Sequence, residues 1–252
     1  MKLSRKIIPA LAMLVMSAIM LTTASFAWFA TNADVNANDM SVNIKADSMY
    51  LLIASSTTEM SATQVQQLNT TATAGQTASK LDLKPTAHNA DLNGSTIGTF
   101  SNWYTKVADN KTASTSTSEA TSLTTFENYV AIYKFYVTLA SGSPKAKDLV
   151  LTEYSITASA DSAASGTNQT VDPARVIIAC GENMHEYKGS EATKTGLTAK
   201  LADSVTDTTV VEITVYLYFD GEDTTVYSDN IINLDDFDFT FKLSASADTA
   251  QN

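Results

Sequence analysis

The sequence predicts an all-β fold: a two-sheet jelly-roll-like sandwich with long polar loops, preceded by an N-terminal signal helix. Short runs of β-branched and aromatic residues alternate with segments rich in Ser, Thr, Ala and Asn, a pattern typical of strands joined by polar loops. About eight to ten such strands fit two packed sheets. The sequence shows no internal repeat of about 20–50 residues and no heptad or collagen period.

The expected sandwich domain, residues 41–252, opens with two strands. Residues 41–46 alternate between polar and apolar side chains, which predicts a strand with one buried face. Residues 49–54 form a continuous apolar run, which predicts a strand covered on both faces. One or two helical turns, capped by Ser61, are expected within residues 61–68.

Two Ser/Thr-rich segments, near residues 69–80 and 111–125, are expected to be long loops. Trp103 and Tyr104 lie between them and carry a large apolar area. We expect these two side chains to anchor residues 97–107 on the core.

The second half of the chain carries the strongest strand patterns. Strands are expected at residues 126–139, 148–158, 175–180, 209–219 and 237–243. In the first of these, Ala131, Phe135 and Val137 are expected on one face. Residues 181–189 are interpreted as a polar excursion, and Asp220-Gly221 as a hairpin-type turn.

The N-terminus has the pattern of an export signal. Lys2, Arg5 and Lys6 precede an apolar run that carries no charge until after Ala30 and contains the small-x-small site Ser25-Phe26-Ala27. This predicts a signal peptide over residues 1–27, cleavage between Ala27 and Trp28, and an exposed N-terminal segment over residues 28–40. The alternative is an uncleaved anchor, because about 20 apolar residues can span a bilayer. Either reading places the rest of the chain outside the cytoplasm.

Three segments carry a resemblance to a known family. Residues 24–35 (Ala-Ser-Phe-Ala-Trp-Phe-Ala-Thr-Asn-Ala-Asp-Val), 172–176 (Asp-Pro-Ala-Arg-Val) and 218–223 (Tyr-Phe-Asp-Gly-Glu-Asp) resemble blocks of the TasA/camelysin-like exported surface proteins of Gram-positive bacteria. The resemblance implies a jelly-roll domain and processing by a dedicated signal peptidase. In some members, the freed N-terminal segment of one subunit completes the sheet of the next. Camelysin itself is described as a protease, so the resemblance also implies a secreted hydrolase as an alternative.

The charge balance restricts the partners. The chain has 16 basic and 27 acidic residues, with a formal net charge of −11. Such a surface repels nucleic-acid phosphates and anionic lipid headgroups. We therefore expect no nucleic-acid partner, and membrane contact only through the signal segment before cleavage.

Few residues in the sequence have the pattern of a catalytic or metal site. The two histidines, His88 and His185, are expected in polar loops, and no nucleophile-elbow, phosphate-loop or His-Glu-x-x-His motif occurs. Glu182, His185 and Glu186 are a weak zinc pattern. No catalytic residue and no cofactor is expected. Cys180, the single cysteine, is expected to be a small buried hydrophobe, with an intermolecular disulfide as the alternative.

Calcium is the one cofactor that the sequence favours at all. Hard cations bind clustered carboxylates, and weak candidates follow the strand at residues 209–219: Asp220, Glu222, Asp223 and Asp229. Asp235, Asp236 and Asp238 precede the last strand. The EF-hand spacing is missing, and the turn at Asp220-Gly221 accounts for part of the pattern.

The sequence and the resemblance together predict a structural protein of the cell surface or biofilm matrix, secreted to that location. We expect it to be a filament subunit, with itself or other matrix or surface proteins as partners. Alternating residues within the segment 28–40 are the expected donor strand: Asp34, Val35, Asn36 and Ala37. The alternative is a monomeric adhesin or carbohydrate-binding module that uses Trp103 and Tyr104 as a stacking platform.

Overall fold

The computed structural model describes residues 40–44, 51–66, 71–74, 83–89, 95–105, 121–159, 170–223, 226 and 237–248. The chain divides into two compact units, residues 1–36 and 37–252, and every described residue belongs to the second. The predicted signal peptide, the cleavage site between Ala27 and Trp28, and the donor residues Asp34 to Ala37 lie outside the described residues.

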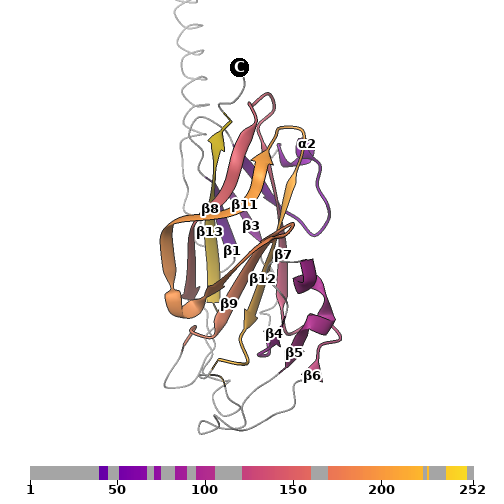
Figure 1. The fold of residues 1–252 in the computed structure, drawn as a ribbon, viewed down its shortest axis with the longest axis vertical. Helices are drawn as coiled ribbons and strands as arrows, with labels where there is room; N and C mark the ends of the chain where they lie inside the picture. Colours follow the sequence, from indigo (N-terminus) through magenta and orange to yellow (C-terminus); the bar gives the residue numbers. More distant parts are fainter. Residues whose placement is uncertain are drawn as a thin grey trace, which may run out of the picture. The chain divides into compact units, whose positions relative to one another are not determined.

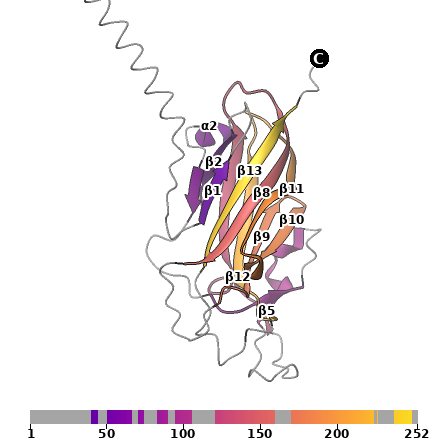
Figure 2. The ribbon, with the colours of Figure 1, turned by 90° about the vertical axis from the view of Figure 1, so that its left-hand side faces the viewer.

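The described residues form an all-β architecture, as the sequence predicts, with a small third sheet beside the two expected sheets (Figure 1). Sheet A has the order β11-β8-β13-β1-β3. Its strands are β1 (Met40–Ile44), β3 (Thr71–Ala74), β8 (Ala146–Ala158), β11 (Thr193–Val205) and β13 (Phe237–Ala247). Figure 2 shows β13, β8 and β11 of this sheet running side by side.

Sheet B has the order β10-β9-β12-β7-β2. Its strands are β2 (Leu51–Ser55), β7 (Ala131–Leu139), β9 (Ala174–Cys180), β10 (Asn183–Lys188) and β12 (Val211–Phe219). A small third sheet has the order β4-β5-β6 and consists of β4 (Ala87–His88), β5 (Trp103–Thr105) and β6 (Thr121–Ser122). The helical elements are α2 (Ala62–Val65) and the 3-10 turns η1 (Ser95–Gly98), η2 (Phe100–Asn102) and η3 (Gly189–Glu191).

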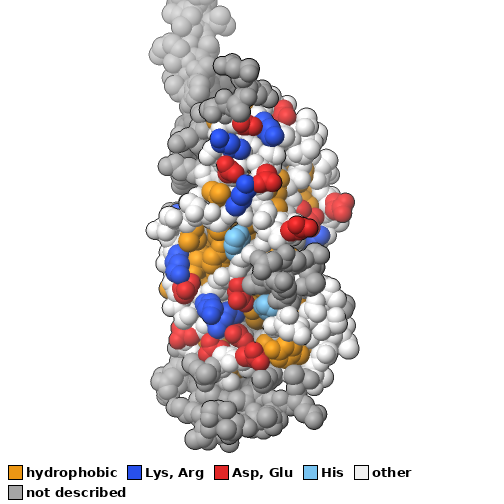
Figure 3. Space-filling model, viewed as in Figure 1, with side chains coloured by type: hydrophobic (Ala, Val, Ile, Leu, Met, Phe, Trp, Pro, Cys, Tyr) orange, Lys and Arg blue, Asp and Glu red, His pale blue; other side chains and the backbone are white. Residues whose placement is uncertain are grey.

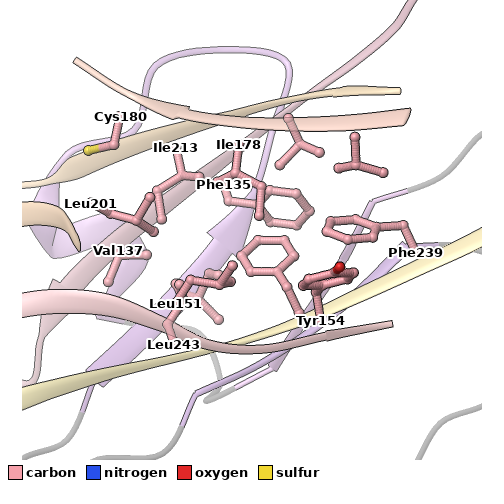
Figure 4. Close-up of a cluster of buried hydrophobic side chains, with 14 of the residues drawn as sticks. Phe135, Val137, Leu151, Tyr154, Ile178, Cys180, Leu201, Ile213, Phe239 and Leu243 are labelled. Atoms are coloured by element: carbon pink, nitrogen blue, oxygen red, sulfur yellow. The ribbon is translucent and has the colours of Figure 1, made fainter. Parts of the chain in front are cut away.

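Sheets A and B pack face to face over one hydrophobic core, which we call the main core. In β7, β9, β12 and β13, alternate residues point into it because successive side chains of a strand lie on opposite faces. In Figure 4, Phe135, Ile178 and Ile213 of sheet B point toward Leu151, Phe239 and Leu243 of sheet A. All six are at most 1 % exposed. The two sheets therefore form a sandwich.

The outer face of sheet B is covered as well. Residues 83–89, 95–105 and 121–130, which we call the cover, contribute Ile97, Trp103, Leu123 and Val130 to a second hydrophobic cluster. Sheet B contributes Ile177, Ala179, Tyr216 and Tyr218 to this cover core. Because β9 has the main core on one face and the cover on the other, all seven of its residues are buried.

Several predicted elements match the structure. The helix α2 follows Ser61, whose backbone N–H donates to Gln64 Oε1 at 2.8 Å. The strand predicted at residues 126–139 begins later, at Ala131, because residues 127–129 form a turn in which Asn128 has a positive φ of 63°. Its face assignment is confirmed, since Ala131, Phe135 and Val137 all lie in the main core.

Two segments predicted as loops contain strands. Residues 71–74 form β3 and pair with β1, and residues 121–122 form β6 and pair with β5. Their Thr, Ser and Ala side chains give no strong apolar alternation. These strands are specified by backbone pairing with neighbours far along the chain, a signal that local composition does not carry.

A turn follows Asp220 as predicted, but it does not begin a hairpin, because both edges of β12 already pair, with β7 and β9. The excursion predicted at residues 181–189 is a hairpin instead. Gly181 takes the positive φ of 58° that the tight turn needs, and β10 returns antiparallel to β9. After Asp220, the next described strand is β13, which lies in the other sheet. The edge strand β11 was not predicted, because its outer side chains are polar and exposed.

Among the described residues, no helix has both the length and the apolar composition that a membrane span requires.

Candidate functional site

Charged and polar side chains converge where the cover meets sheet B. In Figure 3, acidic, basic and His side chains gather in the lower half of the face on which Figure 1 shows β9, β12 and β4. Six of them form a cluster that we call the polar knot: His88 of β4, Arg175 of β9, Glu186 of β10, Tyr218 of β12, and Asp220 and Asp223 just after β12. Contacts join them into two halves, and the charge of Arg175 acts on Glu186 between the halves.

Glu186 is the centre of one half of the knot. Its Oε1 accepts a short hydrogen bond from the Tyr218 hydroxyl and lies 3.3 Å from His88 Nε2. Burial favours the neutral acid and raises the pKa of Glu186. The hydrogen bonds from His88 and Tyr218, with the charges of His88 and Arg175, outweigh burial, so the pKa lies below its usual value. The folded protein therefore favours the carboxylate form of Glu186.

Arg175 is the centre of the other half, with a side chain only 7 % exposed. Its Nη2 lies 2.7 Å from Asp223 Oδ2 and 3.2 Å from Asp220 Oδ2, and its Nη1 donates to the carbonyl oxygen of Asp172 at 2.6 Å. Burial is the largest influence on Asp220 and raises its pKa, despite a hydrogen bond from the Glu222 N–H and the charge of Arg175. A buried guanidinium needs such partners, because removing it from water costs several kcal/mol.

Aromatic rings close the knot on the side of the cover. The Trp103 ring lies edge-on to Tyr218, with centroids 4.9 Å apart, and 5.0 Å from the His88 ring. Trp103 is fully buried, and its Nε1–H donates to the Ile97 carbonyl oxygen at 2.7 Å. The prediction that Trp103 anchors this region on a core is confirmed. A fully buried ring is not available as a stacking platform for a sugar.

Main-chain bonds align the knot. Thr86 forms a parallel bridge with Asp220, in which Thr86 N–H donates to Phe219 O at 2.8 Å and Gly221 N–H donates to Thr86 O at 2.9 Å. These bonds place His88, two residues after Thr86, beside the end of β12. His88 Nδ1 is buried and has no hydrogen-bond partner in the part of the chain that the structure describes.

In the structure, the described calcium candidates contact other side chains instead of converging on one site. Asp220 and Asp223 point at Arg175, and Glu222 hydrogen-bonds the Tyr104 side chain, whose pKa is raised chiefly by burial. Asp229 lies outside the described residues. Within the described ranges, no group of three or more His, Cys, Asp or Glu side chains is arranged to bind a metal ion.

The weak zinc pattern at Glu182, His185 and Glu186 does not form one site. His185 and Glu186 are neighbours on β10, so their side chains point to opposite faces. Glu186 joins the knot, whereas His185 Nε2 contacts the Lys200 carbonyl oxygen of β11 at 3.0 Å. The prediction that both histidines lie in polar loops is wrong, because His88 is in β4 and His185 is in β10.

Cys180 has the environment that the sequence predicts. Its residue is 8 % exposed, its thiol is free, and its side chain packs in the main core. Burial is the main cause that raises the pKa of the thiol to about 11. The thiol is therefore protonated at neutral pH and unreactive in the folded protein.

The knot itself was missed by sequence reasoning. His88 and Glu186 are separated by 98 positions, and Arg175 by 48 positions from Asp223. One signal was present: Arg175 stands at the start of the apolar run 176–179, where a strand buried on both faces would require carboxylate partners for it.

The chain matches no protein-family model, no curated protein and no solved structure. Its likeness to the TasA/camelysin-like proteins therefore rests on the three segments quoted above.

Proposed function

We propose that this chain is an exported structural protein of the cell surface or biofilm matrix. In this proposal it is a filament subunit in which residues 28–40 of one copy add a strand to the sheet of the next. The observation that carries the proposal is the position of β1. This strand begins at Met40, the last residue of the proposed donor segment, and lies inside sheet A, between β13 and β3.

The pairing of β13 supports a donor strand at this place. On one side, β13 pairs with β8 from Phe237 to Ala247. On its other side, it pairs with β1 only from Thr240 to Leu243, and in parallel. The ladder that joins β13 to β8 thus begins at Phe237, whereas the ladder that joins β13 to β1 begins three residues later, at Thr240. Main-chain groups at such a step in a sheet are a template for an added strand.

The buried polar groups also support a scaffold. In the polar knot, the carboxylate of Glu186 contacts His88 and Tyr218. The guanidinium of Arg175 forms ion pairs with Asp220 and Asp223. Side chains engaged with each other in this way stabilise the fold. The burial of Trp103 argues in the same direction, against the carbohydrate-binding alternative.

The proposal is tested on the chain that begins at residue 28, by size-exclusion chromatography and negative-stain electron microscopy. We expect filaments from this chain and only monomers after deletion of residues 28–40. Val35→Pro is a sharper variant, because proline removes a main-chain N–H from the centre of the donor segment. Ala30→Pro is its matched control and should still polymerise.

Two results would contradict the proposal. Filaments that persist unchanged in the Val35→Pro and deletion variants would show that residues 28–40 are not the donor strand. A chain that stays monomeric in all four forms and binds glycans would favour the adhesin alternative instead.

A further inference from the structure

The described part of the second unit contains two large hydrophobic cores that share no residue. The main core lies between sheets A and B, and the cover core lies on the outer face of sheet B. The backbone of sheet B separates them. Leu83 is the one described residue of the cover that packs against the main core. Loss of the cover would therefore leave most contacts of the main core in place, and regions with largely independent contacts can open independently.

The cover has little regular structure of its own. Its strands β4, β5 and β6 have only two or three residues each, and β4 pairs with β5 over just two positions. By contrast, β8 and β11 of sheet A have 13 residues each. Short strands form few cooperative main-chain bonds, so attachment to sheet B must hold the cover in place.

The main-chain bonds of Thr86 tie the cover to the end of β12, and one carboxylate adds a tie that acid can release. Glu186 belongs to sheet B and contacts His88, which belongs to the cover. The titratable and charged groups that face Glu186 are His88 from β4, Tyr218 from β12, Arg175 from β9 and Asp220 from the turn after β12. Hydrogen bonds to an ionised acceptor are about twice as strong as neutral ones, so protonation of Glu186 would weaken its hydrogen bonds with His88 and Tyr218.

We propose that the cover is a lid that opens separately from the sandwich, and that Glu186 is the latch released by acid. Opening uncovers an apolar surface on sheet B made of Ile177, Ala179, Tyr216 and Tyr218. The inference does not depend on the filament proposal. It concerns the outer face of sheet B, whereas the filament proposal concerns sheet A.

The direction of the pH effect follows from Glu186. Its pKa in the folded protein lies below the ordinary value of 4.5. The stabilisation by this carboxylate is therefore complete above about pH 4.5 and is lost as the pH falls through the folded value. The latch should hold at neutral pH and open in more acidic solution.

Fluorescence of Trp103 tests the inference, since this ring is buried in the cover core. The chain has two tryptophans, so Trp28→Phe makes Trp103 the only reporter. We expect its emission to shift to the red, with rising binding of an apolar dye, as the pH falls below about 4.5. The far-UV circular dichroism of the sandwich should change only at lower pH.

In the same background, Glu186→Gln removes the charge of the latch. We expect acrylamide quenching of Trp103 at pH 7 to rise about twofold, with little further change in acid. The matched control is Glu182→Gln, an exposed carboxylate in the turn between β9 and β10, which should behave as the parent.

Coincident Trp103 and circular-dichroism transitions at every pH would overturn the inference. So would a Glu186→Gln variant that keeps the acid profile of the parent. If that variant does not fold, the Trp28→Phe chain is unfolded with urea at pH 4 and at pH 7 instead, and the Trp103 and circular-dichroism transitions are compared. An earlier Trp103 transition, separated further at pH 4, supports the lid, and a single shared transition at both pH values refutes it.

Discussion

The main core and the polar knot are both buried, but different forces stabilise them. The main core consists of apolar side chains from two sheets, such as Phe135 and Phe241, whose rings meet edge to face 5.5 Å apart. The knot depends on a few directed contacts between charged groups, such as Arg175 with Asp223. Truncation of a side chain in the main core leaves a cavity, whereas truncation of a side chain in the knot leaves a charge without its partner. Because the knot contains carboxylates among its central contacts, its stability should depend on pH.

The largest effect is expected in the main core. Phe135→Ala removes a fully buried ring and should lower the free energy of unfolding by about 3–5 kcal/mol. Ile132→Ala is the control on the same strand, because Ile132 is 39 % exposed and should lose less than about 1 kcal/mol. Urea denaturation followed by circular dichroism measures both, and equal losses would contradict the assigned faces of β7.

Arg175→Met tests the charge balance of the knot. It leaves Asp220 and Asp223 without their cation and should cost about 2–3 kcal/mol, less than a fully buried pair because these carboxylates are 23 % and 18 % exposed. The triple variant with Asp220→Asn and Asp223→Asn should recover part of this loss. If the triple variant is no more stable than the single one, unpaired charge is not the cause.

Tyr218→Phe tests the pH dependence of the knot. The Tyr218 hydroxyl helps to lower the pKa of Glu186, so its removal should raise that pKa and cost about 1.5 kcal/mol at pH 7. Because a lowered pKa stabilises only the ionised acid, the loss should shrink as the pH falls below about 4.5.

Tyr187→Phe is the matched control for this variant, since the Tyr187 hydroxyl has no hydrogen-bond partner among the described residues. Its effect on the free energy of unfolding should not vary between pH 4 and pH 7. A pH-independent loss in Tyr218→Phe would mean that its hydroxyl does not act through Glu186.

The smallest effect is expected at an exposed ion pair. Lys242 Nζ lies 2.7 Å from Glu153 Oε1 on sheet A, where the two side chains are 45 % and 29 % exposed. Lys242→Ala should change the free energy of unfolding by less than about 0.5 kcal/mol, and salt should screen even that. A loss as large as that of Arg175→Met would show that burial does not explain the difference in stability expected between the two ion pairs.

The sequence predicted most of the sandwich strands, because alternation is a local pattern. The strands around Phe135, Tyr154 and Ile213 each show apolar residues at every second position facing one core. It failed for β3, β6 and β11, whose Thr-, Ser- and Lys-containing segments have few apolar residues. Edge strands of this kind cannot be predicted from their own residues and become evident only from the strands with which they pair.

The sequence by itself determined the all-β class, the positions of the main strands and the burial of Trp103 and Cys180. Each of these follows from the apolar content of a short segment, which must leave water wherever the segment lies. The tertiary structure alone decided that residues 83–89, 95–105 and 121–130 cover sheet B, that Glu186 meets His88 of this cover, and that Arg175 meets Asp223. The two residues of these pairs are separated by 98 and 48 positions, respectively, and no local pattern states which distant segment a buried charge will meet.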